Sequence, residues 1–210
     1  MTKRIRQLDS QTIAAIAAGE VVENPASVVK ELCALDAGAD IIRVEIAGGG
    51  IRRIVISDNG HGMNQDDALH AFDQHATSKI LTIEDLETVG TMGFRGEALA
   101  SIASVSKVTL DTREPGENMG TRVVIHGGEL LEHVPTGCRE GTTIRIDELF
   151  YNVPARYKFL KTDQTEGTRV ASLLRHLALA RPDVSFHLTS DRKEILHSPG
   201  NDDLLSTIHA

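Results

Sequence analysis

Three segments of the sequence carry residues that are suited to holding a flat ring and a chain of phosphates. In "VISDNGHGM", Asp58 ends an expected strand and is followed by Gly60, Gly62 and Met63. A carboxylate there can accept a hydrogen bond from an exocyclic amine such as that of adenine, and the glycines let the backbone approach a flat ring. The same residues also suit a plain strand-to-turn junction, so this segment alone leaves both interpretations open.

The second and third segments are suited to an anion. In "MGFRGEALASI", Gly93 and Gly96 flank Phe94 and Arg95, and a helix is expected to follow at once. Free N–H groups at a helix start bind phosphate, and glycine allows phosphate to come close. The segment matches neither the Walker A pattern nor the Rossmann fingerprint. Upstream, "HATSK" adds three possible phosphate donors, Thr77, Ser78 and Lys79, although the lysine alone would suit an ordinary solvated loop.

Hydrophobic periodicity predicts the elements that must position these residues. We expect helices over 10–18, 25–36, 64–72, 96–105 and 164–180, and strands over 41–46, 51–57, 105–112, 121–128, 142–149, 184–190 and 193–198. The glycines at 48–50 suit a tight hairpin, Asn64 suits a helix cap, and residues 201–210 close no obvious element. Because strand pairs with short turns dominate, the sheet should be mixed or mostly antiparallel, with helices packed on one face.

Composition narrows the class of protein. The chain has 210 residues and a net charge of −8, which suggests one domain, or one with part of a second, and argues against a chain that coats nucleic acid. Two cysteines, Cys33 and Cys138, are too few for a disulfide framework, so we expect reduced thiols. No apolar run approaches membrane length, and the first 22 residues favour a short amphipathic helix over a signal peptide.

Taken together, the motifs resemble a known family. "AAGEVVENPASVVKEL", "DNGHGM", "HATSKI", "GFRGEALASI", "GTTIRIDELFYNVPAR" and "KFL" are similar to the N-terminal ATPase region of the MutL DNA mismatch-repair proteins, within the GHKL superfamily. The resemblance covers about residues 4–190, with the motifs in family order. "GFRGEALASI" and "FYNVPAR" are specific to the MutL branch, and they argue against the alternative of a topoisomerase subunit or chaperone.

The resemblance implies a fold and an activity. The fold would be an α+β GHKL-type (Bergerat) sandwich, a mixed, mostly antiparallel sheet with helices on one face. Residues 1–200 would form the ATP-binding subdomain, and 201–210 would begin a linker to a second subdomain that this sequence does not reach. The activity would be ATP binding and hydrolysis that gates the pairing of two N-terminal regions. The alternative is a nucleotide-binding switch module that does not hydrolyse ATP.

The resemblance also implies roles for individual residues. Glu31 would be the general base that activates the attacking water, although without the motif it would pass for a solvent-facing glutamate beside Lys30. Asp58 would recognise adenine, and Thr143 would line the floor of the pocket. The remaining nucleotide-binding positions would be Gly60, Gly62, Met63, Thr77, Ser78, Lys79, Gly93, Phe94, Arg95, Gly96 and Leu99.

The implied cofactors are ATP and Mg²⁺. The implied partners are a second copy of the chain in a nucleotide-dependent N-terminal dimer, a mismatch-recognition protein, a downstream endonuclease or helicase, and DNA, which would be bound mainly through regions outside this chain. No membrane partner is expected, and the location would be cytoplasmic and nucleoid-associated, or nuclear in a eukaryote. A phosphate-contacting lysine of the family would come from the following subdomain.

The catalytic helix departs from the family pattern. Asn24 and Pro25 begin it well, and Val28, Val29 and Leu32 form its apolar stripe, but the stripe loses phase after Cys33. Family members carry a Mg²⁺-binding Asn four residues after the catalytic Glu, where this chain has Leu35, which cannot bind a hard cation. Either two residues are truly absent and Mg²⁺ binding and hydrolysis are crippled, or the printed chain omits two residues of Glu-Asn type.

Overall fold

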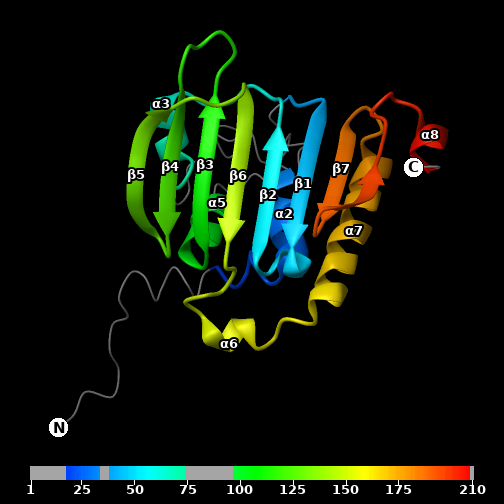
Figure 1. The fold of residues 1–210 in the computed structure, drawn as a ribbon, viewed down its shortest axis with the longest axis horizontal. Coiled ribbons are helices and arrows are strands. Elements are labelled where there is room, and N and C mark those ends of the chain that lie inside the picture. The colour runs from blue at the N-terminus through cyan, green and yellow to red at the C-terminus, as the bar shows by residue number, and fades with distance from the viewer. Residues whose placement is uncertain (1–17, 34–37, 74–96, 209–210) are drawn as a thin grey trace, which may run out of the picture.

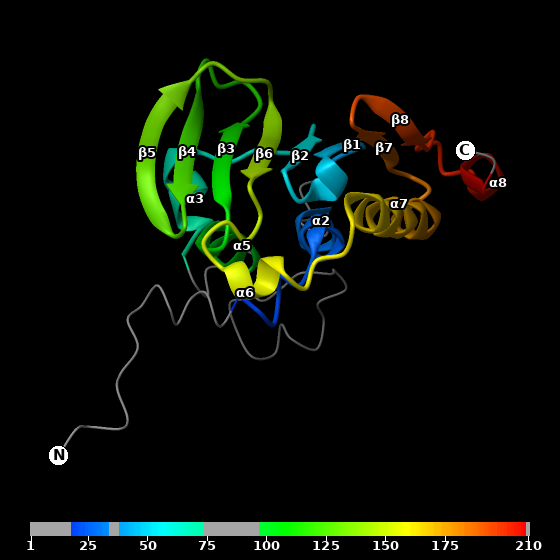
Figure 2. The ribbon, with the colours of Figure 1, turned by 60° about the horizontal axis from the view of Figure 1, so that its bottom comes forward.

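The computed structural model describes residues 18–33, 38–73 and 97–208, and every structural statement below concerns these ranges. They contain one eight-stranded sheet in the order β5-β4-β3-β6-β2-β1-β7-β8. Neighbouring strands pair antiparallel except for β1 and β7, which pair in parallel. The helices α2, α5 and α7 lie side by side on one face of the sheet (Figure 1, Figure 2). The α+β sandwich predicted from the sequence is therefore confirmed.

The elements follow one another along the chain as helices mixed with strand pairs. They are α2 Pro25–Cys33, β1 Ile41–Ala47, the 3₁₀ turn η1 Gly48–Gly50, β2 Arg53–Asp58, α3 Gln65–His70, α5 Ala98–Ser104, β3 Lys107–Arg113, β4 Gly120–His126, β5 Glu129–Thr136, β6 Gly141–Asp147, α6 Pro154–Tyr157, α7 Asp163–Ala180, β7 Ser185–Ser190, β8 Lys193–His197 and α8 Leu204–Ile208.

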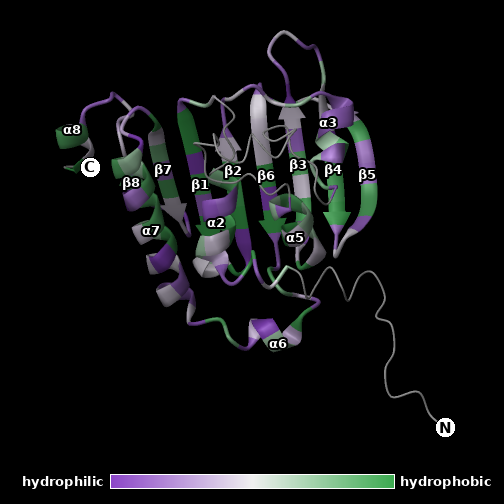
Figure 3. Ribbon diagram, turned by 180° about the vertical axis from the view of Figure 1, so that it is seen from behind, coloured by the Kyte–Doolittle hydropathy of each residue, from purple (hydrophilic) through white to green (hydrophobic). Residues whose placement is uncertain are grey.

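The central strands bury alternate side chains, as a half-covered sheet requires. In β1 the buried residues are Ile42, Val44 and Ile46, while the alternate positions Arg43 and Glu45 are exposed. The buried positions form one core with buried residues of α2, α5 and α7, the helices that cover this face of the sheet (Figure 3). Within the described ranges, no helix covers the opposite face of the sheet, which we call the outer face. The exposed residues that alternate with the buried ones, such as Arg43 and Glu45, point to it (Figure 2).

Two short glycine turns connect neighbouring strands of the sheet. Gly48, Gly49 and Gly50 all have positive φ, which confirms the tight connection predicted between β1 and β2. Gly127 and Gly128 also have positive φ, at 58° and 86°, so they form the turn between β4 and β5. The prediction that strand 121–128 includes these two glycines was wrong, because both glycines adopt the left-handed conformation that a tight hairpin needs.

One strand and two short helices were not predicted. β5 lies at the edge of the sheet, and its eight residues bury no side chain fully, so it lacks the alternation that identifies a strand. Pro135, near its end, is a residue that edge strands tolerate. The helices α6 and α8 have four and five residues, too few for a periodic signal. The predicted helix at 10–18 lies outside the described residues except for Ala18.

Both cysteines are free thiols, as predicted. Within the described ranges, no helix is long and apolar enough to cross a membrane.

Candidate functional site

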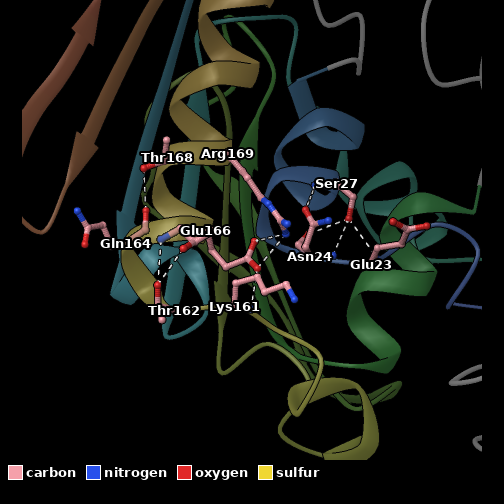
Figure 4. Close-up of polar contacts among 10 residues, drawn as sticks. Glu23, Asn24, Ser27, Lys161, Thr162, Gln164, Glu166, Thr168 and Arg169 are labelled. Atoms are coloured by element: carbon pink, nitrogen blue, oxygen red, sulfur yellow. Dashed lines mark hydrogen bonds and ion pairs between the residues drawn. The ribbon is translucent and has the colours of Figure 1, made fainter.

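The start of α2 is fixed by a reciprocal cap (Figure 4). Asn24 Oδ1 accepts a hydrogen bond from the N–H of Ser27 at 3.0 Å, which confirms Asn24 as the N-cap. Ser27 Oγ in turn accepts from the N–H groups of Glu23 and Asn24, at 2.9 and 3.1 Å, so the cap works in both directions. Because three backbone N–H groups are satisfied at this end, the helix that carries Glu31 begins at a defined residue.

Helix α7 lies beside α2 on the same face of the sheet, and its first turns hold a buried carboxylate (Figure 4). The Glu166 side chain is 1% exposed and pairs with Arg169 at 3.1 Å, while the same carboxylate oxygen accepts the N–H of Lys161 at 2.9 Å. This bond closes the loop that leads from α6 into α7. Glu166 thus stabilises the first turns of α7, the helix against which α2 packs.

The direction of α2 follows from its contacts at each end. Pro25, at its start, lies so close to Gly50 that a Cβ on Gly50 would stand 2.7 Å from the Pro25 side chain. Cys33 lies at the end of α2. Burial raises the pKa of the Cys33 thiol to about 12, and the nearby Asp58 carboxylate adds to the rise. Because α2 and β2 therefore run the same way, Glu31 lies at the Asp58 end of the sheet.

Glu31 occupies the last described turn of α2. Its side chain is half-buried, whereas that of its neighbour Lys30 is exposed. Among the described residues, no hydrogen bond or ion pair involves the Glu31 carboxylate. A half-buried carboxylate on a rigid helix, whose oxygens accept no hydrogen bond from the described residues, is suited to orienting a water molecule.

Asp58 is positioned by the backbone at the end of β2. Its Oδ1 accepts the N–H of Gly60 at 2.9 Å and the N–H of Thr142, on β6, at 3.2 Å. Burial raises the pKa of this half-buried carboxyl above its usual 3.8, and the two backbone hydrogen bonds partly oppose the rise. Since Oδ1 takes both backbone bonds, Oδ2 is the oxygen available to accept from a ligand.

The loop after Asp58 is tied to β1 and β3. Asn59 Oδ1 accepts the N–H groups of Asp40 and Ile41, at 3.0 and 2.9 Å, which joins the loop to the start of β1. Met63 donates its N–H to Thr112 Oγ1 at 2.9 Å, which joins the loop to the end of β3. These bonds hold the backbone of residues 59–63 in one conformation beside Asp58.

Gly62 is required in this loop for two reasons. Its φ is +63°, a conformation that residues with a Cβ rarely adopt, and a Cβ there would collide with the carbonyl oxygen of Arg113. Gly60 is buried, and its N–H points at Asp58 Oδ1. The glycines of "DNGHGM" therefore allow the backbone to approach β3 and the Asp58 carboxylate closely, while the predicted approach to a flat ring stays a prediction.

The floor beside Asp58 is made by β6. Thr143 is half-buried and donates its hydroxyl to Ser57 Oγ, at 3.0 Å, across the β2–β6 ladder. Thr112 Oγ1 donates to the carbonyl of Gly141, at 3.2 Å, and lies 3.0 Å from Thr142 Oγ1. The structure thus brings Glu31, Asp58 and the 60–63 loop to one end of the helix-covered face. Thr143, predicted to line the pocket floor, alternates with the buried Ile144 and Ile146, so its side chain points to the outer face of the sheet, as that of Arg145 does.

Several supporting residues were missed from the sequence. Asn59, Thr112 and Thr142 carry no charge and stand at strand ends, so nothing in their spacing separates them from ordinary turn residues. Asn59 had the one available signal, because an Asn in a turn satisfies nearby backbone N–H groups. Cys33 was noted for its helical phase and not for its proximity to Asp58.

Other predicted positions are placed only in part. Leu99 is buried on α5, which packs next to α2 in the core. The predicted positions Thr77, Ser78, Lys79, Gly93, Phe94, Arg95 and Gly96 lie outside the described residues. So does the shortfall in the helix after Cys33, including Leu35.

The donor set of the described residues does not complete a Mg²⁺ site. In the last described turn of α2, the hard oxygen ligands are limited to the carboxylate of Glu31, because Leu32 is apolar and Cys33 offers sulfur. Mg²⁺ requires oxygen ligands in near-octahedral geometry. The Glu31 carboxylate alone therefore cannot hold Mg²⁺ in that geometry.

A surface hollow lies on the outer face, away from these residues. It is lined by basic side chains, including Arg53, Lys107 and Arg145. Their charges are compensated in part: Arg53 and Arg145 share Asp147, at 2.6 and 3.1 Å, and Lys107 pairs with Glu148 at 2.7 Å. The hollow therefore keeps a positive charge, because two carboxylates face these three cations and Arg52.

Comparison with known proteins places this geometry in context. Residues 23–128 match the family described as histidine kinase-, DNA gyrase B- and HSP90-like ATPases. The chain is 50% identical over 200 residues to the DNA mismatch repair protein MutL of Caldanaerobacter subterraneus subsp. tengcongensis, covering 94% of this chain and 34% of that protein. It is 54% identical over 202 residues to the MutL of Desulforamulus reducens, covering 95% and 32%. The chain thus spans about a third of the length of these relatives.

Solved structures agree with the sequence relatives. The MutL ATPase domain of Aquifex aeolicus, complexed with ADP, is 34% identical with a TM-score of 0.70, covering 90% of this chain and 68% of that one. The N-terminal domain of a DNA repair protein is 25% identical with a TM-score of 0.77, covering 93% and 59%.

Proposed function

Because the chain belongs to the histidine kinase-, DNA gyrase B- and HSP90-like ATPase family, in its MutL branch, we propose that it binds ATP at the Asp58 end of the sheet and hydrolyses it with Glu31. The observation that carries the proposal is the Asp58 carboxylate. Two backbone N–H groups hold its Oδ1 in place, which aims the other oxygen at an incoming donor. The adenine amine supplies that donor, and the ADP complex of the Aquifex aeolicus domain supports an adenine nucleotide as ligand.

Hydrolysis would rest on position more than on covalent chemistry. Phosphoryl transfer needs a water held in line with the γ-phosphate, and a carboxylate on a rigid helix can orient that water and accept its proton. Glu31 is half-buried, which keeps competing water away from one side of the carboxylate. The loop at 59–63 would shape the adenine pocket, beside Thr142, whose N–H is donated to Asp58. The phosphates would be held by Thr77, Ser78, Lys79 and the segment from Gly93 to Gly96.

The test separates binding from turnover. Glu31→Gln keeps the shape of the side chain and removes its basicity, so we expect turnover to fall by roughly 10²–10⁴-fold, the usual contribution of a general base. ATP affinity measured by calorimetry should stay within about threefold, since the base contributes to the transition state and little to the ground state. Glu23→Gln, at the exposed start of the same helix, is the matched control and should leave turnover unchanged.

The alternative of a switch module that binds but does not hydrolyse has its own outcome. It predicts no turnover by the unaltered chain above a Glu31→Gln background, with nucleotide binding intact. The same alternative predicts no turnover by a longer chain that contains the following subdomain. Turnover that appears only in the longer chain would instead support the expected lysine from that subdomain.

We further propose that ATP binding pairs two N-terminal regions and that hydrolysis separates them. In this account the protein couples mismatch recognition to a downstream endonuclease or helicase on DNA. Because the proposed pairing depends on nucleotide, the chain without nucleotide should be mostly monomeric. Sedimentation with and without a non-hydrolysable ATP analogue tests this, and a stable dimer without nucleotide would contradict it.

The role of Mg²⁺ can be tested through the printed sequence itself. With Leu35 four residues after Glu31, the chain lacks the amide ligand that the family pattern provides. We expect its ATP affinity to respond weakly to Mg²⁺, and we expect insertion of Glu-Asn after Cys33 to restore the response and raise turnover. Insertion of Ala-Ala restores the helix phase without the amide and is the control.

A further inference from the structure

The β7–β8 hairpin carries a cluster of side chains outside the nucleotide site. His187 on β7 and His197 on β8 face each other in the antiparallel register. Their rings stack with centroids 4.0 Å apart and an angle of 29° between the planes. Leu188 is buried against the helices, so its neighbour His187 points to the outer face of the sheet, which no helix covers.

A third ligand reaches this face because β8 is irregular. The register shifts between Leu188 and Thr189, so Leu196 pairs with Leu188 while Glu194, two residues earlier in β8, pairs with Thr189. In a regular strand, residues three apart point to opposite faces. The irregularity turns Glu194 to the face of His197, three residues away. One ligand atom from each of His187, Glu194 and His197 then lies within 4.8 Å of the others.

The tautomer of His187 is set by a buried serine. Ser185 Oγ donates to the carbonyl of Ser198 at 2.8 Å, so its proton is used. His187 Nε2 lies 3.1 Å from the same Oγ, which must therefore accept from Nε2–H. The Nδ1 atom of His187 is left with its lone pair, as a metal ligand requires. Hydrogen bonds of this kind orient histidine ligands in metal sites.

The charges around the cluster balance. Arg43 faces His187 from β1 and adds a positive charge, while Glu194 adds a negative one.

We propose that His187, His197 and Glu194 form a binding site for a divalent transition metal of the zinc class, at the edge of the sheet. Two imidazoles and one carboxylate are the donor set that Zn²⁺ and its neighbours prefer, and three protein ligands leave a fourth position for water. The ion would link β7 to the edge strand β8. β1 lies between β7 and β2 (Figure 1), and the cluster is on the outer face of the sheet while α2 covers the other face, so the site is separate from nucleotide binding.

The test is metal binding by the whole chain after removal of any polyhistidine tag. Calorimetry with Zn²⁺, and visible absorption with Co²⁺ as a spectroscopic probe, should show one ion bound per chain. His197→Ala and Glu194→Gln alter exposed side chains, so both variants should fold, which circular dichroism checks. We expect His197→Ala to weaken binding by at least roughly 10–100-fold, the range seen when even an outer-shell partner is lost.

Two controls make the result decisive. His176→Ala removes an exposed histidine on α7 and should leave affinity unchanged. A double Cys33→Ser, Cys138→Ser variant should also keep the site, which separates it from binding to thiols. Equal affinity of His197→Ala and the unaltered chain would overturn the proposal, as would binding that disappears only with the cysteines.

Discussion

The substitution Asp58→Asn is the most informative single change in the candidate nucleotide site. The amide oxygen can keep the two backbone hydrogen bonds from Gly60 and Thr142 that Oδ1 now accepts. The second position, however, changes from an acceptor to an N–H₂ donor that would face the adenine amine. A polar mismatch of this kind costs about 1–3 kcal/mol. Since 1.4 kcal/mol is tenfold in affinity, ADP should bind roughly 5- to 150-fold more weakly.

The stability of the nucleotide-free protein should move the other way. The pKa of Asp58 is raised above 3.8 in the fold, so its contribution to stability is full below that value and is lost as pH rises through the folded pKa. At pH 7 the charged carboxylate therefore destabilises the free protein, and Asn carries no such cost. The melting temperature of Asp58→Asn at pH 7 should equal or exceed that of the unaltered chain, and its advantage should shrink as the pH falls towards 3.8.

Calorimetry with two nucleotides completes the test. IDP presents a carbonyl where ADP presents an amine, so the unaltered chain should favour ADP, and Asp58→Asn should lose that preference because its N–H₂ can donate to the carbonyl. Asp183→Asn alters a distant, solvent-exposed ion pair with Arg181 and is the control. Unchanged ADP affinity in Asp58→Asn would refute the assignment, and so would weaker binding that comes with a lower melting temperature at pH 7.

Three further predictions concern the framework of the site. Gly62→Ala should abolish detectable nucleotide binding and destabilise the fold more than Gly116→Ala, which shares the positive φ but has open space around it and should cost about 1–2 kcal/mol in urea denaturation; equal costs would contradict the close approach of the 59–63 loop to β3. Glu166→Ala should lower the free energy of unfolding by roughly 2 kcal/mol, through one lost backbone hydrogen bond and a cavity, and a neutral effect would argue against its anchoring role. Cys33, whose pKa is raised to about 12 mainly by burial, should react with alkylating reagents at pH 8 much more slowly than a free thiol. Mass spectrometry of the labelled peptides measures this, and rapid labelling would mean that the thiol is not buried.

Local sequence signals predicted the covered part of the fold well. Alternation in "IIRVEI" and "IRRIVIS" and the cap at Asn24 depend on neighbours within a few residues, and the structure confirms them. β5 was missed because an edge strand exposed on both faces shows no alternation, and the irregularity in β8 depends on its pairing with β7. Such features arise from tertiary contacts that single-sequence periodicity does not contain.

The same division applies to the candidate site. Asp58 ends β2 and is followed by glycines, as predicted, but these residues also suit an ordinary turn, so the family resemblance and not their types singled them out. Glu31 was found through the family resemblance, since one helix glutamate beside a lysine has no distinctive spacing. Thr112 and Asn59, which hold the loop, join residues far apart in sequence. Their partners become visible only when the strands are in register.

A crystal structure of the chain with ADP tests the central claim most directly. The account predicts that the adenine ring lies between α2 and the loop at 59–63, with its exocyclic amine about 2.7–3.2 Å from Asp58 Oδ2. It also predicts that Glu31 lies on the side of the phosphates, with its carboxylate free of any protein partner. Adenine bound away from Asp58, or an Asp58 carboxylate that turns to a protein donor in the complex, would contradict it.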